Sequence, residues 1–233
     1  LLLYALSAAL HVAFLMAEQA RESERLVLES RVTAREAELR ALRSQLNPHF
    51  LFNSLNSINA LVGREPEAAR LMCEGLGEFL RRTLNLGARD RVTLGEELAL
   101  VNQYLEIERV RFGERLRVDR RIDADLDACL IPPLLLQPLV ENAVKFGVAA
   151  RLEGGLVTLT ARRIQAHLQV DIENPCDGDA PGRPGEGVGI DNVRRRLRAF
   201  DPDRTRMEIS REPGRFAVRL YLPFTIAPTG DAT

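Results

Sequence analysis

The sequence predicts an α+β protein, in which a helical N-terminal part precedes a sandwich of helices on one face of a mixed β-sheet. Up to about residue 112, apolar residues recur at helical spacing. Beyond that point, segments with strand-like composition alternate with helical segments. This order of elements is typical of a sheet that is covered by helices on one face.

The composition excludes several classes of protein. Hydrophobic residues make up 45% of the 233 positions and charged residues 28%, so the chain can fold around a core. A net charge of −1 gives no support to direct binding of nucleic acid by bulk charge. The 3 cysteines are far apart, which argues against a disulfide framework or a zinc site, and the 3 histidines form no cluster for a metal.

The first 17 residues contain no charged side chain. A stretch of this length is at the lower limit of what spans a bilayer. It begins without a methionine or a basic segment, so a signal peptide fits poorly. We expect residues 1–17 to be the end of a transmembrane helix, and a buried core helix is the alternative.

From residue 18 the composition becomes charge-rich, and a seven-residue spacing appears. The positions that follow this spacing are Leu28, Val32, Arg35, Leu39, Leu42 and Leu46. We therefore expect a short parallel coiled coil over residues 18–44, with Arg35 as its polar defect. A solvated single helix is the alternative, because the spacing covers fewer than three repeats.

Residues 45–112 are expected to form the next unit, a helical hairpin followed by a connecting helix. Asn47-Pro48 interrupts the preceding pattern, because the residue before a proline avoids the α region while proline suits the first turn of a helix. A first helix to about residue 62 and a second over about 67–86 would then pack antiparallel. Such a hairpin needs a partner to cover its apolar stripe, which favours a four-helix bundle in a homodimer.

The connecting helix begins with a capping signature, since Thr93 is followed three residues later by Glu96. Residues 113–226 are expected to form the sandwich, and residues 227–233 a disordered tail. Helices are expected at about 133–147 and 190–200. The expected strands cover residues 116–122, 156–163, 168–173, 206–211 and 216–222.

One histidine lies in the first turn of the first hairpin helix. At about 100° per residue, His49 shares a polar stripe with Asn53 and Asn56. The apolar residues expected on the opposite side, toward the hairpin core, are Leu51, Leu55, Ile58 and Val62. This weakens the interpretation of His49 as a core residue, and no further metal ligand lies one turn away. A solvent-facing imidazole can act as a nucleophile, with Asn53 orienting a water or a phosphoryl oxygen, but a plain surface histidine is equally compatible.

A second candidate site is the segment "PLVENAVKFG" at residues 138–147. Asn142 and Lys145 would share a helix face, and an asparagine oxygen is a suitable ligand for Mg²⁺. Lys145 is the only lysine in the chain, and a compact ammonium suits phosphate neutralisation. The alternative is an ordinary ion pair between Glu141 and Lys145.

A third candidate is the glycine-rich run that ends in Gly187 and Gly189 and leads into a helix. Glycines let backbone N–H groups approach a phosphate, and a helix N-terminus adds partial positive charge. The arginines at 194–196 could assist phosphate binding or form a solvated face. The run does not follow a strand directly, so a dinucleotide-binding motif fits poorly.

Together these segments resemble the LytS-like sensor histidine kinases, membrane-anchored members of two-component systems whose ATPase domain has the GHKL (Bergerat) fold. The resemblance covers nearly everything after residue 40. It depends on four motifs that occur in the family's order: "LRSQLNPHFLFNSLNSI", "LVNQYLEIERVRFGERL", "IPPLLLQPLVENAVKFG" and "GVGIDNVRRRL".

The resemblance implies roles for individual residues. His49 would be the phosphoacceptor, Asn53 would assist phosphatase chemistry, and Glu141 would belong to the catalytic set. Asn142 would bind Mg²⁺, with Lys145 beside it. The remaining ATP contacts implied are Glu173 or Asn174 at the adenine, Gly187 and Gly189 at the phosphates, and Asn192 and Arg196.

Two departures from the family pattern are visible. "ENPCDG" replaces the usual Asp-Asn-Gly, so the adenine contact falls to Glu173 or Asn174. Phe50 replaces the acid that follows the phosphoacceptor in some histidine kinases, which leaves the general base unassigned.

The implied activity is autophosphorylation of His49 from Mg-ATP and transfer of the phosphoryl group to an aspartate of a response regulator. The implied protein is a homodimer in the bacterial inner membrane with its kinase portion in the cytoplasm. A non-catalytic dimeric adaptor with a degenerate ATPase domain is the alternative. A GHKL chaperone or repair ATPase would leave the outward histidine and the apolar N-terminus without a purpose.

Overall fold

The computed structural model describes residues 47–176 and 186–226. The predicted transmembrane end at 1–17, the predicted coiled coil at 18–44 and the predicted tail at 227–233 lie outside the described residues. Within the described ranges, no helix is both long enough and apolar enough to cross a membrane.

Two helices form the predicted antiparallel hairpin. Helix α2 spans Pro48–Val62 and helix α3 spans Pro66–Gly87, and the two pack against each other. Asn47 is the N-cap of α2, and Pro48 occupies its first turn, where the missing proline N–H has no hydrogen bond to lose. The Asn-Pro pair is therefore a helix start, as the sequence predicts.

Helix α4 spans Leu94–Phe112 and packs on both hairpin helices. Its N-terminus carries the predicted capping box, in which Thr93 and Glu96 satisfy each other's backbone N–H groups. Two short strands flank α4 in the sequence, β1 at Val92–Thr93 before it and β3 at Leu130–Ile131 after it. They form an antiparallel pair that the sequence did not reveal. Two-residue strands carry too little pattern to be recognised.

The C-terminal part contains a five-stranded sheet in the order β2-β4-β5-β7-β6. Its strands are β2 at Leu116–Ile122, β4 at Gly155–Ile164, β5 at His167–Asn174, β6 at Arg206–Glu212 and β7 at Arg215–Pro223. The β2–β4 pair is parallel and the other pairs are antiparallel. The expected mixed sheet is confirmed, and each strand lies within two residues of its predicted bounds.

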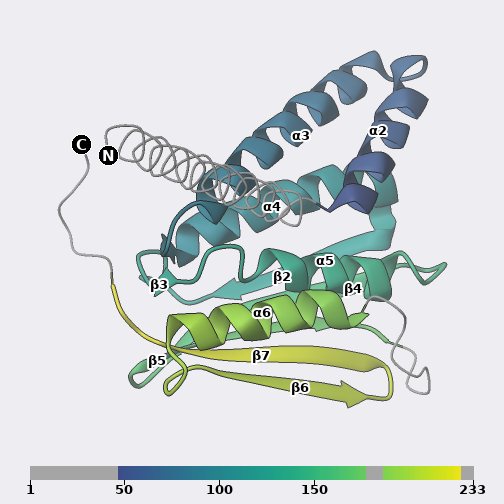
Figure 1. Ribbon diagram of the computed structural model, residues 1–233. Coiled ribbons are helices and arrows are strands. Elements are labelled where there is room, and N and C mark those ends of the chain that lie inside the picture. Colours follow the sequence, from purple (N-terminus) through teal and green to yellow (C-terminus); the bar gives the residue numbers. More distant parts are fainter. Residues whose placement is uncertain (1–46, 177–185, 227–233) are drawn as a thin grey trace, which may run out of the picture. The chain divides into compact units, whose positions relative to one another are not determined.

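Three helical segments cover one face of this sheet. They are α5 at Gln137–Asn142, the π-helix η2 at Ala143–Val148, and α6 at Glu186–Phe200. Helices α5 and α6 lie side by side, and η2 packs on β4 and β5 (Figure 1). Val157, Leu159 and Ile172 point to this side and are buried, so the core lies between the sheet and its helices.

The opposite face of the sheet is polar. Its cross-strand ion pairs include Arg219 with Asp171 and Arg215 with Glu173. Asp171 is only 5% exposed because long arginine side chains cover it. The two faces follow the period of two that places neighbouring strand residues on opposite sides.

The expected core face of α2 is partly wrong. Leu51 and Ile58 pack against the core, but Leu55 and Val62 are 55% and 57% exposed. Phe50 is buried instead, with its ring centroid 5.2 Å from that of Phe79 on α3. Helix α4 contributes Tyr104 to the same aromatic cluster, so α2 is packed by two helices rather than by its hairpin partner alone.

Candidate functional site

His49 is exposed on α2, on the side of the helix that the sequence predicts for it. The amide nitrogen of Asn53, one turn further on, lies 3.2 Å from Nδ1 and 3.3 Å from Nε2 of the ring. Rotation of the amide by 180° would present its oxygen, which accepts the N–H of a neutral imidazole. The amide lies at nearly the same distance from both ring nitrogens, so it can hold the imidazole in place without distinguishing the two nitrogens.

The N-terminus of α2 is tied directly to α5. Asn47 accepts the backbone N–H of Phe50 at 3.2 Å through Oδ1 and donates from Nδ2 to Oε2 of Glu141 at 2.9 Å. The other oxygen of Glu141 accepts from Nε2 of Gln137 at 2.8 Å. The alternative prediction of a Glu141–Lys145 pair is not observed, since the described partners of Glu141 are Asn47 and Gln137.

Burial raises the pKa of the Glu141 carboxyl above its ordinary value, and the hydrogen bonds from Gln137 and Asn47 oppose this rise. Glu108 on α4 is 2% exposed, and burial raises its pKa as well, while Arg111 lowers it. The hydroxyl of Tyr104 has its pKa raised chiefly by burial and further by these two carboxylates. Glu108 and Glu141 thus lie in an apolar setting at the junction of α2, α4 and α5. This setting favours the protonated form of each carboxyl group.

Asn142 meets the N-terminal turn of α6. A methyl group at Gly189 would lie 2.8 Å from Nδ2 of Asn142, so only glycine permits this approach. The same Nδ2 is buried and has no hydrogen-bond partner among the described residues. An unsatisfied buried amide beside a helix N-terminus fits a polar ligand. The donor set, an asparagine oxygen next to backbone N–H groups, suits Mg²⁺ with phosphate oxygens.

Lys145 lies in η2 rather than in an α-helix. A π-helical hydrogen bond joins the N–H of Ala149 to the carbonyl of Val144 at 2.9 Å. The wider turn changes the angle between Asn142 and Lys145 from the predicted α-helical value, and such π-segments occur frequently at functional sites. The Lys145 ammonium is exposed and lies 4.8 Å from the ring centroid of Phe146.

The two candidates for the adenine contact lie on different faces of the sheet. Glu173 forms an ion pair with Arg215 on the polar outer face, away from the helices. Asn174 is 5% exposed and packs against Gly147, where a methyl group would lie 2.7 Å from its Nδ2. Of the two expected residues, the structure brings only Asn174 to the helical side where Asn142 lies.

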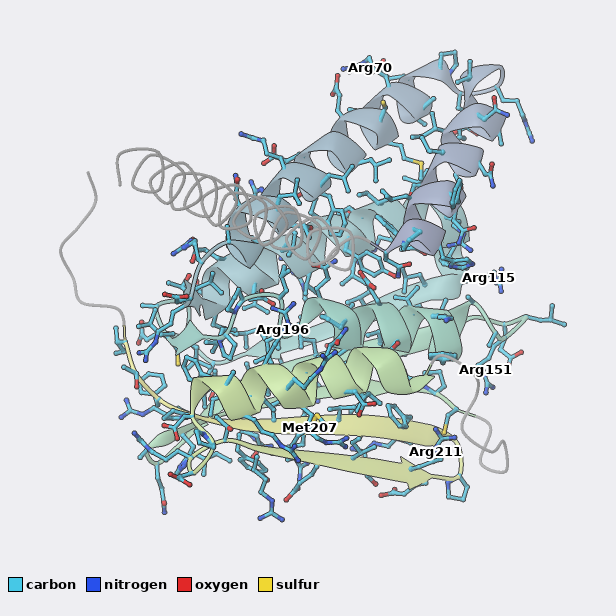
Figure 2. The ribbon with its side chains drawn as sticks, in the orientation of Figure 1. Arg70, Arg115, Arg151, Arg196, Met207 and Arg211 are labelled. Atoms are coloured by element: carbon cyan, nitrogen blue, oxygen red, sulfur yellow. The ribbon has the colours of Figure 1, made fainter. Side chains whose placement is uncertain are left out.

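The remaining candidates belong to α6. This helix begins at Glu186, four residues earlier than expected, so Gly187 and Gly189 lie in its first turn rather than before it. Asn192 accepts a hydrogen bond from Arg195 of the same helix. Arg196 donates to the carbonyl oxygen of Pro133 at 2.6 Å and projects from α6 toward that loop (Figure 2). Its guanidinium is used to join α6 to the segment before α5, so a direct phosphate contact is a poor assignment.

Glu97 on α4 is a residue that the sequence did not single out. Its side chain is fully buried, and its carboxylate accepts the backbone N–H groups of Leu134 and, at 3.0 Å, Leu136. Burial raises the pKa of Glu97 to about 7, opposed by these N–H groups and by the charge of Arg196. Leu134 has a φ of +52°, so the carboxylate anchors a strained turn just before the helix that carries Asn142.

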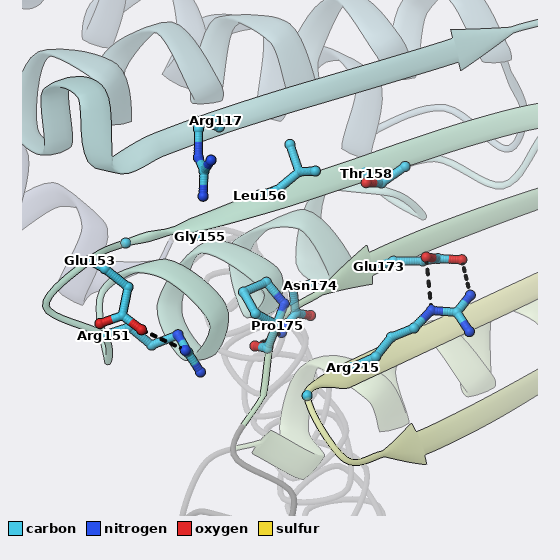
Figure 3. Close-up of a pocket in the computed structure, with 12 residues that line it drawn as sticks. Arg117, Arg151, Glu153, Gly155, Leu156, Thr158, Glu173, Asn174, Pro175 and Arg215 are labelled. Carbon is cyan, nitrogen blue, oxygen red and sulfur yellow. Dashed lines mark hydrogen bonds and ion pairs between the residues drawn. The ribbon is translucent and has the colours of Figure 1, made fainter.

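A hollow of about 340 Å³ lies on the outer face of the sheet, at the ends of β4 and β5. Figure 3 shows Arg117, Glu173 and Arg215 around it, with Glu173 and Arg215 bonded to each other. Asn142, Lys145 and Gly189 do not line this hollow. Of the candidate nucleotide residues, only the two adenine candidates, Glu173 and Asn174, line it, so the hollow is separate from the candidates for Mg²⁺ and phosphate.

Known proteins are similar to this chain in sequence. Residues 37–116 match the family model described as histidine kinase. The sensor histidine kinase BtsS of Escherichia coli is 37% identical over 190 residues, covering 81% of this chain and 34% of that protein. The sensor protein LytS of Staphylococcus haemolyticus is 33% identical over 175 residues, covering 70% of this chain and 30% of that protein.

Among solved structures, the histidine kinase domain of the blue-light activated kinase of Erythrobacter litoralis EL346 aligns with a TM-score of 0.46. It is 16% identical, and the alignment covers 84% of this chain and 94% of that chain.

The fold and the site define a class of proteins in which a helical hairpin with an exposed histidine is joined to an α/β sandwich. The chain belongs to the family of sensor histidine kinases that includes LytS. It spans about a third of the length of the relatives named above, 34% of BtsS and 30% of LytS.

Proposed function

We propose that this chain is an ATP-dependent protein-histidine kinase with a GHKL-type nucleotide domain. It transfers the terminal phosphoryl group of Mg-ATP to His49 and then to an aspartate of a response regulator. The observation that carries the proposal is the contact of Asn142 with Gly189. Two motifs distant in sequence meet there around a buried amide with no partner in the described part of the chain.

In this proposal the residues have separate tasks. His49 attacks with an unprotonated ring nitrogen, and Asn53 holds the imidazole ring in place. Asn142 holds Mg²⁺ through its side-chain oxygen, and the exposed Lys145 neutralises phosphate charge. When bound, Mg²⁺ offsets the negative charge of the phosphates of ATP. Asn174 replaces the aspartate that usually contacts adenine, since Glu173 points to the other face of the sheet.

Exposed apolar side chains support a homodimer. On α2, Phe52 is 67% exposed, and Leu55 and Val62 are more than half exposed; Leu71 on α3 is 56% exposed. Covering such a stripe with the hairpin of a second chain removes apolar surface from water. The uncharged residues 1–17 support attachment to a membrane, which flotation of the full chain with lipid vesicles tests.

The experiment that tests the kinase activity is incubation of the full chain with γ-labelled ATP. We expect label that is lost in acid and retained in alkali. His49→Gln should abolish this label, and Asn142→Ala should reduce it by weakening nucleotide binding. His167→Gln is the matched control, because it removes another histidine from β5 and should leave the label unchanged. Full labelling of His49→Gln would refute the acceptor assignment.

A non-catalytic adaptor is the second candidate. The observation that favours it is the orientation of Glu173, which leaves the adenine contact to an asparagine whose amide donates to Pro175 at 2.9 Å. The adaptor predicts a stable dimer in which the wild-type chain binds nucleotide weakly and acquires no label. Equilibrium binding of a fluorescent ATP analogue, measured beside the labelling assay, separates the two functions.

A further inference from the structure

We propose that Asn47 docks the helix that bears His49 onto the candidate nucleotide helix of its own chain, so that His49 is phosphorylated within one chain. This inference depends on the kinase activity proposed above. It adds a positioning residue, Asn47, and a direction of transfer.

The docking contact uses both ends of one amide. Oδ1 of Asn47 accepts the N–H of Phe50 and so caps α2, while Nδ2 donates to Glu141 of α5. Of the common N-cap side chains, aspartate could perform only the first task, because it has no hydrogen to donate at neutral pH. Asparagine has an acceptor and a donor at the end of one side chain, so it can cap the helix and bind a carboxylate at the same time.

The contact is well placed to be strong. Glu141 is held on its other oxygen by Gln137, so the carboxylate has a fixed orientation when it meets Asn47. The hydrogen bond lies in the apolar junction of α2, α4 and α5, where a bond to a charged group is stronger than in water.

His49 is fixed from both sides while its own ring remains free. Asn47 precedes it by two residues and binds α5, and Phe50 follows it and packs between Phe79 and Tyr104. His49 itself is exposed. The backbone that carries the imidazole is therefore held in place, while the ring is accessible to solvent.

The geometry of the backbone limits the distance between His49 and the docked residue Asn47. Two residues span at most about 7 Å, so the Cα of His49 lies within this distance of the Cα of Asn47. Asn142 directly follows Glu141, the residue that Asn47 binds. The acceptor of the same chain is thus attached beside the helix that carries the candidate nucleotide residues.

The transfer step is a displacement at phosphorus. The unprotonated ring nitrogen of His49 attacks the terminal phosphorus of ATP, and a P–N bond forms. The P–O bond to the β-phosphate breaks, and ADP leaves with the electron pair. The proton on the second ring nitrogen is released to solvent, which leaves a neutral imidazole ring that bears the negatively charged phosphoryl group.

The direction of transfer is tested with mixed dimers of two full chains that carry different affinity tags. One chain carries His49→Gln and the other Asn142→Ala, and the dimers are isolated by successive capture on both tags. Transfer within a chain predicts that the Asn142→Ala chain carries no more label in the mixed dimer than in an Asn142→Ala homodimer, while a wild-type dimer is fully labelled. Label on that chain at about half the wild-type level or more would overturn the inference. Failure of the wild-type dimer itself to label would instead refute the proposed kinase activity.

The role of Asn47 is tested by Asn47→Asp, which keeps the cap and replaces the donor by a second carboxylate facing Glu141. We expect the maximal rate of phosphorylation to fall at least about tenfold with the KM for ATP within about twofold of the wild-type value. Asn85→Asp, which adds the same charge at an exposed position near the end of α3, should retain the wild-type rate. An unchanged rate in Asn47→Asp, or a rise in KM that accounts for the whole loss, would overturn the assignment.

Discussion

Replacement of Glu97 by glutamine gives a test of how the nucleotide helix is anchored. The carboxylate of Glu97 is fully buried and accepts the N–H groups of Leu134 and Leu136, with each oxygen serving one donor. Glutamine keeps the shape but offers an oxygen to only one of them, and its NH₂ group faces the other. A buried donor left without an acceptor costs about 1–3 kcal/mol. Even a protonated Glu97 keeps an oxygen at each donor, so Glu97→Gln should be destabilised under acidic conditions.

The pH dependence of this effect follows from the raised pKa of Glu97. The carboxyl titrates near 4.5 when unfolded and at about 7 when buried in the native protein. Between these values the native state binds more protons than the unfolded state, so stability falls as pH rises. The contribution is fully present below the unfolded pKa and is lost as pH rises through about 7. A difference of about 2.5 pH units corresponds to about 3 kcal/mol.

Urea unfolding of both chains between about pH 5 and about pH 8 provides the measurement. The stability advantage of wild type over Glu97→Gln should shrink by about 3 kcal/mol across this range, since glutamine does not titrate. Glu106→Gln removes an exposed carboxylate of the same helix and should leave the wild-type pH profile unchanged. An advantage that stays constant or grows with pH would refute the conclusion that burial dominates the ionisation of Glu97.

Three further predictions concern the site and the packing. Gly189→Ala should displace the Asn142 amide and weaken binding of a fluorescent ATP analogue at least about tenfold without a change in circular dichroism; unchanged affinity would show that the close contact is unimportant. Thr93→Ala should lower the free energy of unfolding by about 1 kcal/mol in urea, because it removes the cap of α4. Phe50→Ala should cost about 3–5 kcal/mol in the same assay, and a cost below about 1 kcal/mol would contradict the aromatic core described for α2.

The periodic elements could be predicted because local patterns encode them. The capping box of α4 depends on Thr93 and Glu96, three residues apart, and the start of α2 on the adjacent Asn47 and Pro48. The buried face of α2 was less accessible, because Phe50 is covered by a residue of α4 that is distant in sequence. Hydrophobic spacing identifies an amphipathic helix but not the number of elements that pack on it.

In the candidate site, too, some features could be predicted from sequence motifs, whereas contacts between residues distant in sequence could not. The resemblance to LytS-like kinases placed Asn142 and Gly189 in one site, and the structure brings them into contact. The hydrogen bond from Asn47 to Glu141 crosses 94 positions of sequence, and no local pattern indicates it. The choice between Glu173 and Asn174 required the register of β5, because one position along a strand reverses the face.

The single lysine has a practical consequence. Arginine does not react with amine-directed acylating reagents, so Lys145 offers the only side-chain amine in the chain for a covalent reporter group. Its exposure at the rim of the candidate site makes it accessible to such a reagent. Acylation at this one position, followed by mass spectrometry, would therefore report directly whether a triphosphate shields the site, with no engineered label.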